Sequence, residues 1–306
     1  MLFRSLGRMK QALSAFDLDI PAFTLATGDT GARFVLDRPA TVTPVNGGVL
    51  TVRPGAGPVF SAARGERGGG SLSLTATRGQ GLPEAAFGIP RWSLIDGGFT
   101  ATLDGRAALD FDLARGITLQ TRGELTSSGG RLTYTAAGCA PVSVERLELG
   151  DNDVTDISGG FCPSDRPMVE VRNGAWRADG RLSGLNASAP FLALHFRDAE
   201  GALTADGGPR GVGLQARIAS ATVVDATDPA RFNPLTATGA ARLADQNWTG
   251  AFDLSRGGTG LGRLDLAHDG RSGVGGLTIE ASEIVFSEGS RRGGCPPRRR
   301  SSGSAP

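Results

Sequence analysis

The sequence predicts an all-β protein, a long twisted and mostly antiparallel sheet with little helix. Short segments in which apolar and polar residues alternate recur roughly every 10 to 15 residues, the pattern of strands with one sheltered face. Turns rich in glycine separate them, and 47 of the 306 residues are glycine. The spacing leaves no room for the crossovers of about a dozen residues that parallel strands need, so neighbouring strands are expected to be antiparallel.

The alternation is clearest between Asn247 and Phe286. This stretch predicts three strands joined by two glycine-rich turns, with the apolar residues of each strand on one face. Those apolar residues are Phe252, Leu254, Leu264, Leu266, Leu277 and Ile279.

Further strands are predicted upstream from the same alternation. Their apolar positions include Leu109, Phe111, Leu113, Ile117, Leu119, Leu192, Leu194 and Phe196. The dipeptide Asp104-Gly105 predicts a tight turn, and residues 79–90, which contain two prolines, predict a loop. A slip of one residue in the pattern between Val144 and Leu147 predicts a β-bulge.

Three regions are expected. Residues 1–95 contain short strands and begin the sheet, residues 96–286 form its repetitive part, and residues 287–306 form a disordered Arg-rich tail. Short helices are expected only at the N-terminus, where apolar residues recur at helical spacing, and at Asp225 to Phe232.

Charge and hydropathy exclude several classes of protein. The formal net charge is +1, and the tail alone holds five Arg against one Glu, so the body is nearly neutral and no nucleic-acid partner is expected. The chain lacks an apolar run of about 18 residues, so no transmembrane helix is expected. The N-terminus has no continuous apolar core, so no signal peptide is expected.

Side chains suited to catalysis or metal binding are few and scattered, and neither a phosphate-binding loop nor a dinucleotide fingerprint occurs. The acidic loop that starts at Gly150 lacks the glycine and glutamate of a calcium-binding loop. We therefore expect a non-enzymatic protein with no metal and no cofactor. The residues weighed for such roles are His195, His268, Asp110, Asp112, Asp151, Asp153 and Asp156.

Two of the three cysteines, Cys139 and Cys162, each lie beside a proline-containing turn. A disulfide between them would stabilise the protein by about 3 kcal/mol and would require an oxidising compartment. Two free buried thiols are the alternative, and both states remain open. Cys295 lies in the tail and carries no expectation.

Three segments resemble a known family: LDGRAALDFDLARG, GCAPVSVERLELGDNDVTDISGGFCP and RFNPLTATGAARLADQNWTGAFDL. With the strands after them, they resemble the YdbH-like proteins within the broader AsmA and TamB-like group. The resemblance covers Gly98 to Phe286. It implies a taco-like β-groove whose apolar interior carries phospholipid acyl chains between the inner and outer membranes across the periplasm. Members are anchored in the inner membrane and are much longer, so the resemblance also implies a fragment.

The expected function is therefore non-enzymatic lipid transport, with phospholipid acyl chains, and other envelope proteins, as partners. The apolar positions named above would line the groove, and they fit equally well as core residues of a closed fold. Two alternatives remain: a secreted or surface β-solenoid acting as an adhesin or on carbohydrate, and a structural docking domain of the cell envelope. An open apolar groove, a parallel solenoid and a closed dry core are the geometries that distinguish the three.

Overall fold

The computed structural model describes residues 14–80, 82–111, 114–148, 152–208, 211–272 and 274–281. The protein is 73% strand and 2% helix, and its 21 described strands form one large antiparallel sheet. The prediction of an all-β, groove-like antiparallel sheet is confirmed.

The sheet begins with strands from the N-terminal half of the chain. These are β1 (Phe16–Asp19), β2 (Phe23–Gly28), β3 (Gly31–Leu36), β4 (Ala40–Pro44), β5 (Leu50–Pro54), β6 (Phe60–Ala63), β7 (Gly69–Ala76), β8 (Glu84–Ile95), β9 (Gly98–Phe111) and β10 (Ala114–Ser128). The remaining elements are β11 (Arg131–Ala136), β12 (Ala140–Leu147), β13 (Val154–Cys162), β14 (Val169–Arg172), β15 (Ala175–Ala189), the single 3₁₀ turn η1 (Pro190–Leu192), β16 (Leu194–Gly208), β17 (Gly211–Asp225), β18 (Leu235–Ala244), β19 (Asn247–Arg256), β20 (Thr259–Asp269) and β21 (Val274–Ala281).

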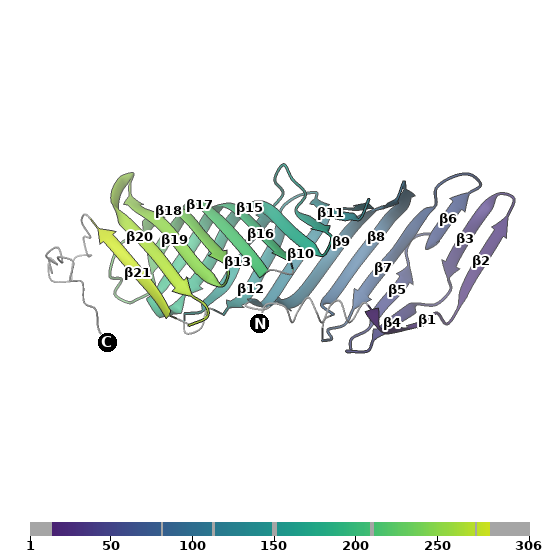
Figure 1. Cartoon of the computed structure of the whole chain (residues 1–306), viewed down its shortest axis with the longest axis horizontal. Helices are drawn as coiled ribbons and strands as arrows, with labels where there is room; N and C mark the ends of the chain where they lie inside the picture. Colours follow the sequence, from purple (N-terminus) through teal and green to yellow (C-terminus); the bar gives the residue numbers. More distant parts are fainter. Residues whose placement is uncertain are drawn as a thin grey trace.

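The strands follow one another across the sheet in nearly the order of the sequence (Figure 1). Some positions in this meander are filled by two short strands in place of one long one. Both β11 and β12 pair with β10, and both β13 and β14 pair with β15. The sheet also runs unbroken through the expected boundary at residue 95, because β8 pairs with β9 through Ile95 and Gly98.

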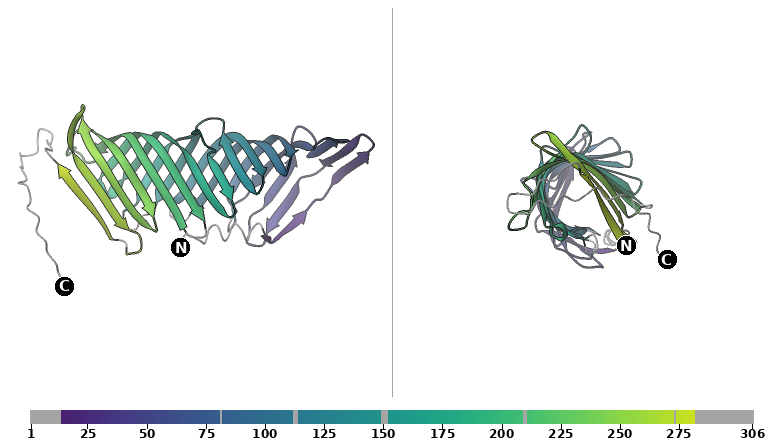
Figure 2. Two further views of the ribbon diagram at one scale, coloured as in Figure 1. Left: turned by 45° about the horizontal axis from the view of Figure 1, so that its top comes forward. Right: turned by 90° about the vertical axis from the view of Figure 1, so that its left-hand side faces the viewer.

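Accumulated twist rolls the sheet about its long axis. In the end-on view of Figure 2 the strands run around that axis, so the sheet is a trough and not a flat plate. The yellow strand β21 lies at one end of the trough, and β2 and β3 lie at the other (Figure 1).

The register gives the sheet one apolar and one polar face, because directly paired residues point to the same side. The exposure of alanine residues can be compared directly between the two faces, because the side chain is the same on both. Three alanines of the apolar face are buried: Ala76, Ala101 and Ala237. Three alanines of the polar face are exposed: Ala202, Ala240 and Ala267. The sheltered apolar face is therefore the inner face of the trough.

The apolar face is sheltered but does not close into a dry core. Among the described residues, more than half of the buried apolar residues are alanines, and only a few large side chains, such as Leu182 and Leu243, are buried. Most leucines and phenylalanines of this face are half-buried. Exposed large apolar side chains occur mainly in the end strands, as in Leu25 at 61% and Val274 at 68%.

The expected loop over residues 79–90 is wrong in its second half, since β8 already begins at Glu84. Pro90 does not interrupt this strand, because the register of β8 against β9 shifts between Gly88 and Arg91. A bulge of this kind accommodates a residue that has no N–H to donate.

The expected turn at Asp104-Gly105 is also wrong, because β9 runs straight through it. Gly105 lies directly opposite Phe87. A Cβ atom at residue 105 would lie 2.7 Å from the Phe87 ring and closer still to the Ala86 carbonyl oxygen. Glycine is needed here for close packing rather than for a turn.

The bulge predicted between Val144 and Leu147 is absent, because β12 pairs with β13 without a shift of register. Leu147 therefore lies on the face opposite to Val142 and Val144. The short helix expected from Asp225 to Phe232 is also absent, because Asp225 ends β17 and residues 226–234 form the loop before β18. The N-terminal helix and the Arg-rich tail fall outside the described residues.

Candidate ligand-binding faces

The central predicted contact residues meet on the apolar face. Leu109 of β9 lies directly opposite Ile117 of β10. Leu119 lies between Ala107 of β9 and Val142 of β12. Because strands carry side chains alternately to opposite faces, these five residues line one side of the sheet.

The C-terminal strands continue the same lining. Phe252 of β19 lies opposite Leu264 of β20, which in turn lies opposite Ile279 of β21. Leu266 lies opposite Leu277. Leu277 and Ile279 are 42% and 50% exposed, because β21 is the last described strand and nothing described flanks it on the other side.

Between these two groups the lining continues on β16 to β19. Leu194 and Phe196 share one face of β16, and Phe196 lies opposite Val223 of β17. Leu254 of β19 lies opposite Ala237 of β18. The predicted residues are thus joined by directly paired apolar positions across the described strands.

Three predicted residues differ from this pattern. Leu192 is not in a strand, because Pro190 starts the 3₁₀ turn η1 and Ala193 has a left-handed backbone with φ of 51°. Phe111 lies in β9 opposite Ala114, beyond the point at which the register of β9 against β10 shifts. Leu113 lies outside the described residues.

An ion pair between the buried Asp225, the last residue of β17, and the half-exposed Arg231 holds the loop after β17 to the η1 turn. The Asp225 side chain has no exposed surface and accepts hydrogen bonds from Arg231 Nε and Nη2, the latter at 2.9 Å. Arg231 Nη2 also donates to the carbonyl oxygens of Leu192 and Ala193. The Arg231 guanidinium, with help from the Thr227 backbone N–H, holds the pKa of Asp225 far below its ordinary value. Sequence patterning missed this ion pair because the carbonyl oxygens that Arg231 contacts belong to a separate segment, at Leu192 and Ala193.

A disulfide joins Cys139 and Cys162. Cys139 follows β11 and Cys162 ends β13, so the bond ties the loop before β12 to the strand after it. Of the two states left open by the sequence, the structure has the disulfide.

A hollow of about 700 Å³ lies on the opposite, polar face, and only Leu119 of the predicted contact residues contributes to it. We define the polar hollow by two rows of paired residues on that face. One row is Thr75, Ala86, Arg106 and Gln120. The other row is Glu84, Ala108, Thr118, Ser143 and Ser158. Between the rows, the backbone of residues whose side chains point to the apolar face forms the floor.

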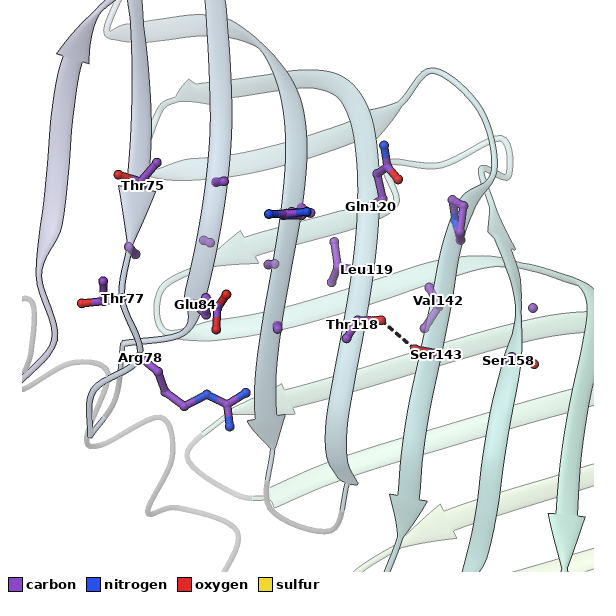
Figure 3. A pocket seen from close by; sticks show the side chains of 18 residues that line it. Thr75, Thr77, Arg78, Glu84, Thr118, Leu119, Gln120, Val142, Ser143 and Ser158 are labelled. Carbon is purple, nitrogen blue, oxygen red and sulfur yellow. Dashed lines mark hydrogen bonds between the residues drawn. The ribbon is translucent and has the colours of Figure 1, made fainter.

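The polar hollow is open, and its walls carry polar groups from neighbouring strands (Figure 3). The Thr118 and Ser143 hydroxyls share a hydrogen bond of 2.6 Å. Arg78 at the rim forms an ion pair with Asp110, which also accepts a hydrogen bond from the Gly116 N–H. Asp110 therefore has a structural role in the part of the chain that is described.

Other residues weighed for chemistry remain apart. His195 hydrogen-bonds Ser188, and His268 lies opposite Trp248. Asp153 lies near Arg146, at 3.7 Å. Within the described ranges, no group of three or more His, Cys, Asp or Glu residues is placed to hold a metal ion. None of the described helices has the length and hydropathy needed to cross a membrane.

Comparison with family models, with curated proteins and with solved structures gave no match to this chain.

Proposed function

We propose that this chain is a non-enzymatic lipid-handling module, part of a groove that carries phospholipid acyl chains between the inner and outer membranes across the periplasm. One observation carries the proposal: the apolar inner face continues from strand to strand, and most of the large described side chains on it are only half-buried. In an ordinary domain a second layer covers such a face. Here acyl chains would cover it.

The mechanism would be passive. An acyl chain has no hydrogen-bonding groups, so it can slide along half-buried Leu, Phe, Val and Ala side chains without breaking specific contacts. The head group would stay in water at the open side of the trough. The proposal requires neither a nucleotide nor a catalytic side chain.

Two further observations agree with this proposal. The disulfide suits an oxidising compartment such as the periplasm. The sequence resemblance to YdbH-like proteins points to the same fold and cargo. The antiparallel pairing weighs against the alternative of a parallel β-solenoid.

A structural docking domain of the envelope is the second candidate. The exposed Val274, Leu277 and Ile279 on β21 favour it, since an end strand with exposed apolar side chains is suited to pairing with another protein.

The test is native mass spectrometry of the purified protein with lipid extraction. The wild-type protein should retain phospholipid, and Leu266→Asp should lose most of it, because a carboxylate would then face the acyl chain. Ala267→Asp is the matched control: it adds the same side chain at the next position, which is exposed on the polar face. Absence of lipid from the wild-type protein, or equal loss in both variants, would refute the proposal.

A further inference from the structure

The polar hollow contains two charged side chains that have no partner among the described residues. Arg106 and Glu84 form no ion pair and no hydrogen bond with any described residue. This contrasts with their surroundings, where Arg78 pairs with Asp110 and Arg115 pairs with Glu148. A cation and an anion thus lie in one hollow without contacting each other.

The register places the two residues close together without setting them directly opposite each other. Arg106 lies directly opposite Ala86, and Glu84 lies directly opposite Ala108, on the same two strands and the same face. The two charged residues are therefore diagonal neighbours, with Cβ atoms somewhat less than about 7–8 Å apart. The other diagonal is occupied by two methyl groups, which leave the space between the charges open. Both alanines are more sheltered than the exposed alanines elsewhere on the polar face.

Hydrogen-bonding groups surround each charge. Gln120 lies directly opposite Arg106 on β10, so its amide can donate to the same anion as the guanidinium. Thr118 lies on β10 opposite Ala108, in the same row as Glu84, and its hydroxyl, which shares a hydrogen bond with Ser143, adds a polar group to the hollow. Figure 3 shows Glu84 on β8, and Thr118 and Gln120 on β10, around the hollow.

We propose that the polar hollow binds a small zwitterionic ligand, with its carboxylate or phosphate group at Arg106 and Gln120 and its ammonium group at Glu84. Amino acids and short peptides supply the first kind of anion, and phosphoethanolamine supplies the second. An acyl chain on the apolar face lies across the backbone layer from this site, so the site is separate from the proposed lipid path. A ligand with only one charge would leave the other side chain unpaired and bind more weakly.

Calorimetric titration of the full chain with alanyl-alanine and with phosphoethanolamine tests the site. Acetate and ethylammonium, which carry one charge each, are the comparison ligands. We expect dissociation constants on the order of 1 mM for a zwitterion, as suits an open site, and at least about fivefold weaker binding for either single-charge compound. The zwitterion that binds more tightly identifies the anionic group. Equal binding of acetate and both zwitterions would overturn the proposal.

Variants separate this site from general charge effects. Arg106→Gln and Glu84→Gln should each weaken binding about fivefold, and Ala108→Leu should abolish it by filling the space while leaving both charges in place. Arg122→Gln is the control, since Arg122 lies on the same face but opposite Asp104, outside the hollow.

The double variant that exchanges the two charges, Arg106→Glu with Glu84→Arg, should regain binding, because a zwitterion can bind in the reverse orientation. Failure of that exchange, or equal weakening by Arg122→Gln, would refute the assignment. Circular dichroism of each variant checks that the sheet is intact.

Discussion

Reduction of the disulfide between Cys139 and Cys162 should loosen one part of the sheet and leave the rest unchanged. The two cysteines are 23 residues apart in the sequence. Closing a loop of this length removes about 11 cal/mol/K of entropy from the unfolded segment, or about 3 kcal/mol at 25 °C. The strands inside or beside the loop are β11, β12 and β13, so the effect should appear there first.

The effect should be local because each strand of this meander contacts mainly its neighbours. In such an array, segments open separately, each with its own free energy. A loss of about 3 kcal/mol corresponds to amide exchange that is faster by on the order of 100-fold. Strands β18 to β20 are several strands away and should exchange at an unchanged rate.

Hydrogen exchange with mass spectrometry, with and without a reductant, measures this directly. The double variant Cys139→Ser with Cys162→Ser is the control, and the reductant should have no effect on it. If β11 to β13 exchange equally fast before and after reduction, the disulfide does not stabilise this segment. If all strands speed up together, the sheet unfolds as one unit and the local reasoning is wrong.

The remaining predictions concern single positions. Asp225→Asn should speed amide exchange in residues 226–234 and in η1, because Arg231 loses its charged partner. Since the pKa of Asp225 is lowered in the folded state, its contribution is present above the ordinary value of 3.8 and is lost as the pH falls below it, so exchange at these residues, corrected for its intrinsic rate, should rise in acid. If acid has no effect there, the ion pair between Asp225 and Arg231 does not stabilise this loop. Gly105→Val should destabilise the protein by about 1–3 kcal/mol in thermal unfolding, because the new Cβ would overlap the Ala86 carbonyl. Gly260→Ala is its control, since nothing lies within 4 Å of that position, and an equal loss in both would contradict the packing argument.

Alternation predicted the strands and their sheltered face well, because a strand with one buried side has a period of two in any context. At Phe252, Leu264 and Ile279 the expected face and the paired register agree. The role of a residue could not be predicted where it depends on a side chain from another strand that is far away in the sequence. Gly105 was interpreted as a turn residue, and only the position of Phe87 on the neighbouring strand shows that it is there for packing.

The same limit applies to the candidate sites. The apolar face could be predicted because apolar residues alternate with polar ones in strand after strand along the sequence. The polar hollow depends on Glu84 and Arg106, which lie 22 positions apart and look like ordinary solvent-facing residues. Their diagonal placement, with Ala86 and Ala108 between them, follows from the register of β8 against β9 and has no local signal.

The two proposed sites lie on opposite faces of one sheet, and this predicts that they act independently. Leu266 and Ala108 belong to distant strands and share no partner, and the effects of such substitutions usually add. Leu266→Asp should therefore reduce lipid retention without changing zwitterion binding, and Ala108→Leu should do the reverse. The double variant should show the sum of both losses in native mass spectrometry and in calorimetry. If Ala108→Leu also removes lipid, the hollow and the apolar face are coupled, and the assignment of separate functions to the two faces is wrong.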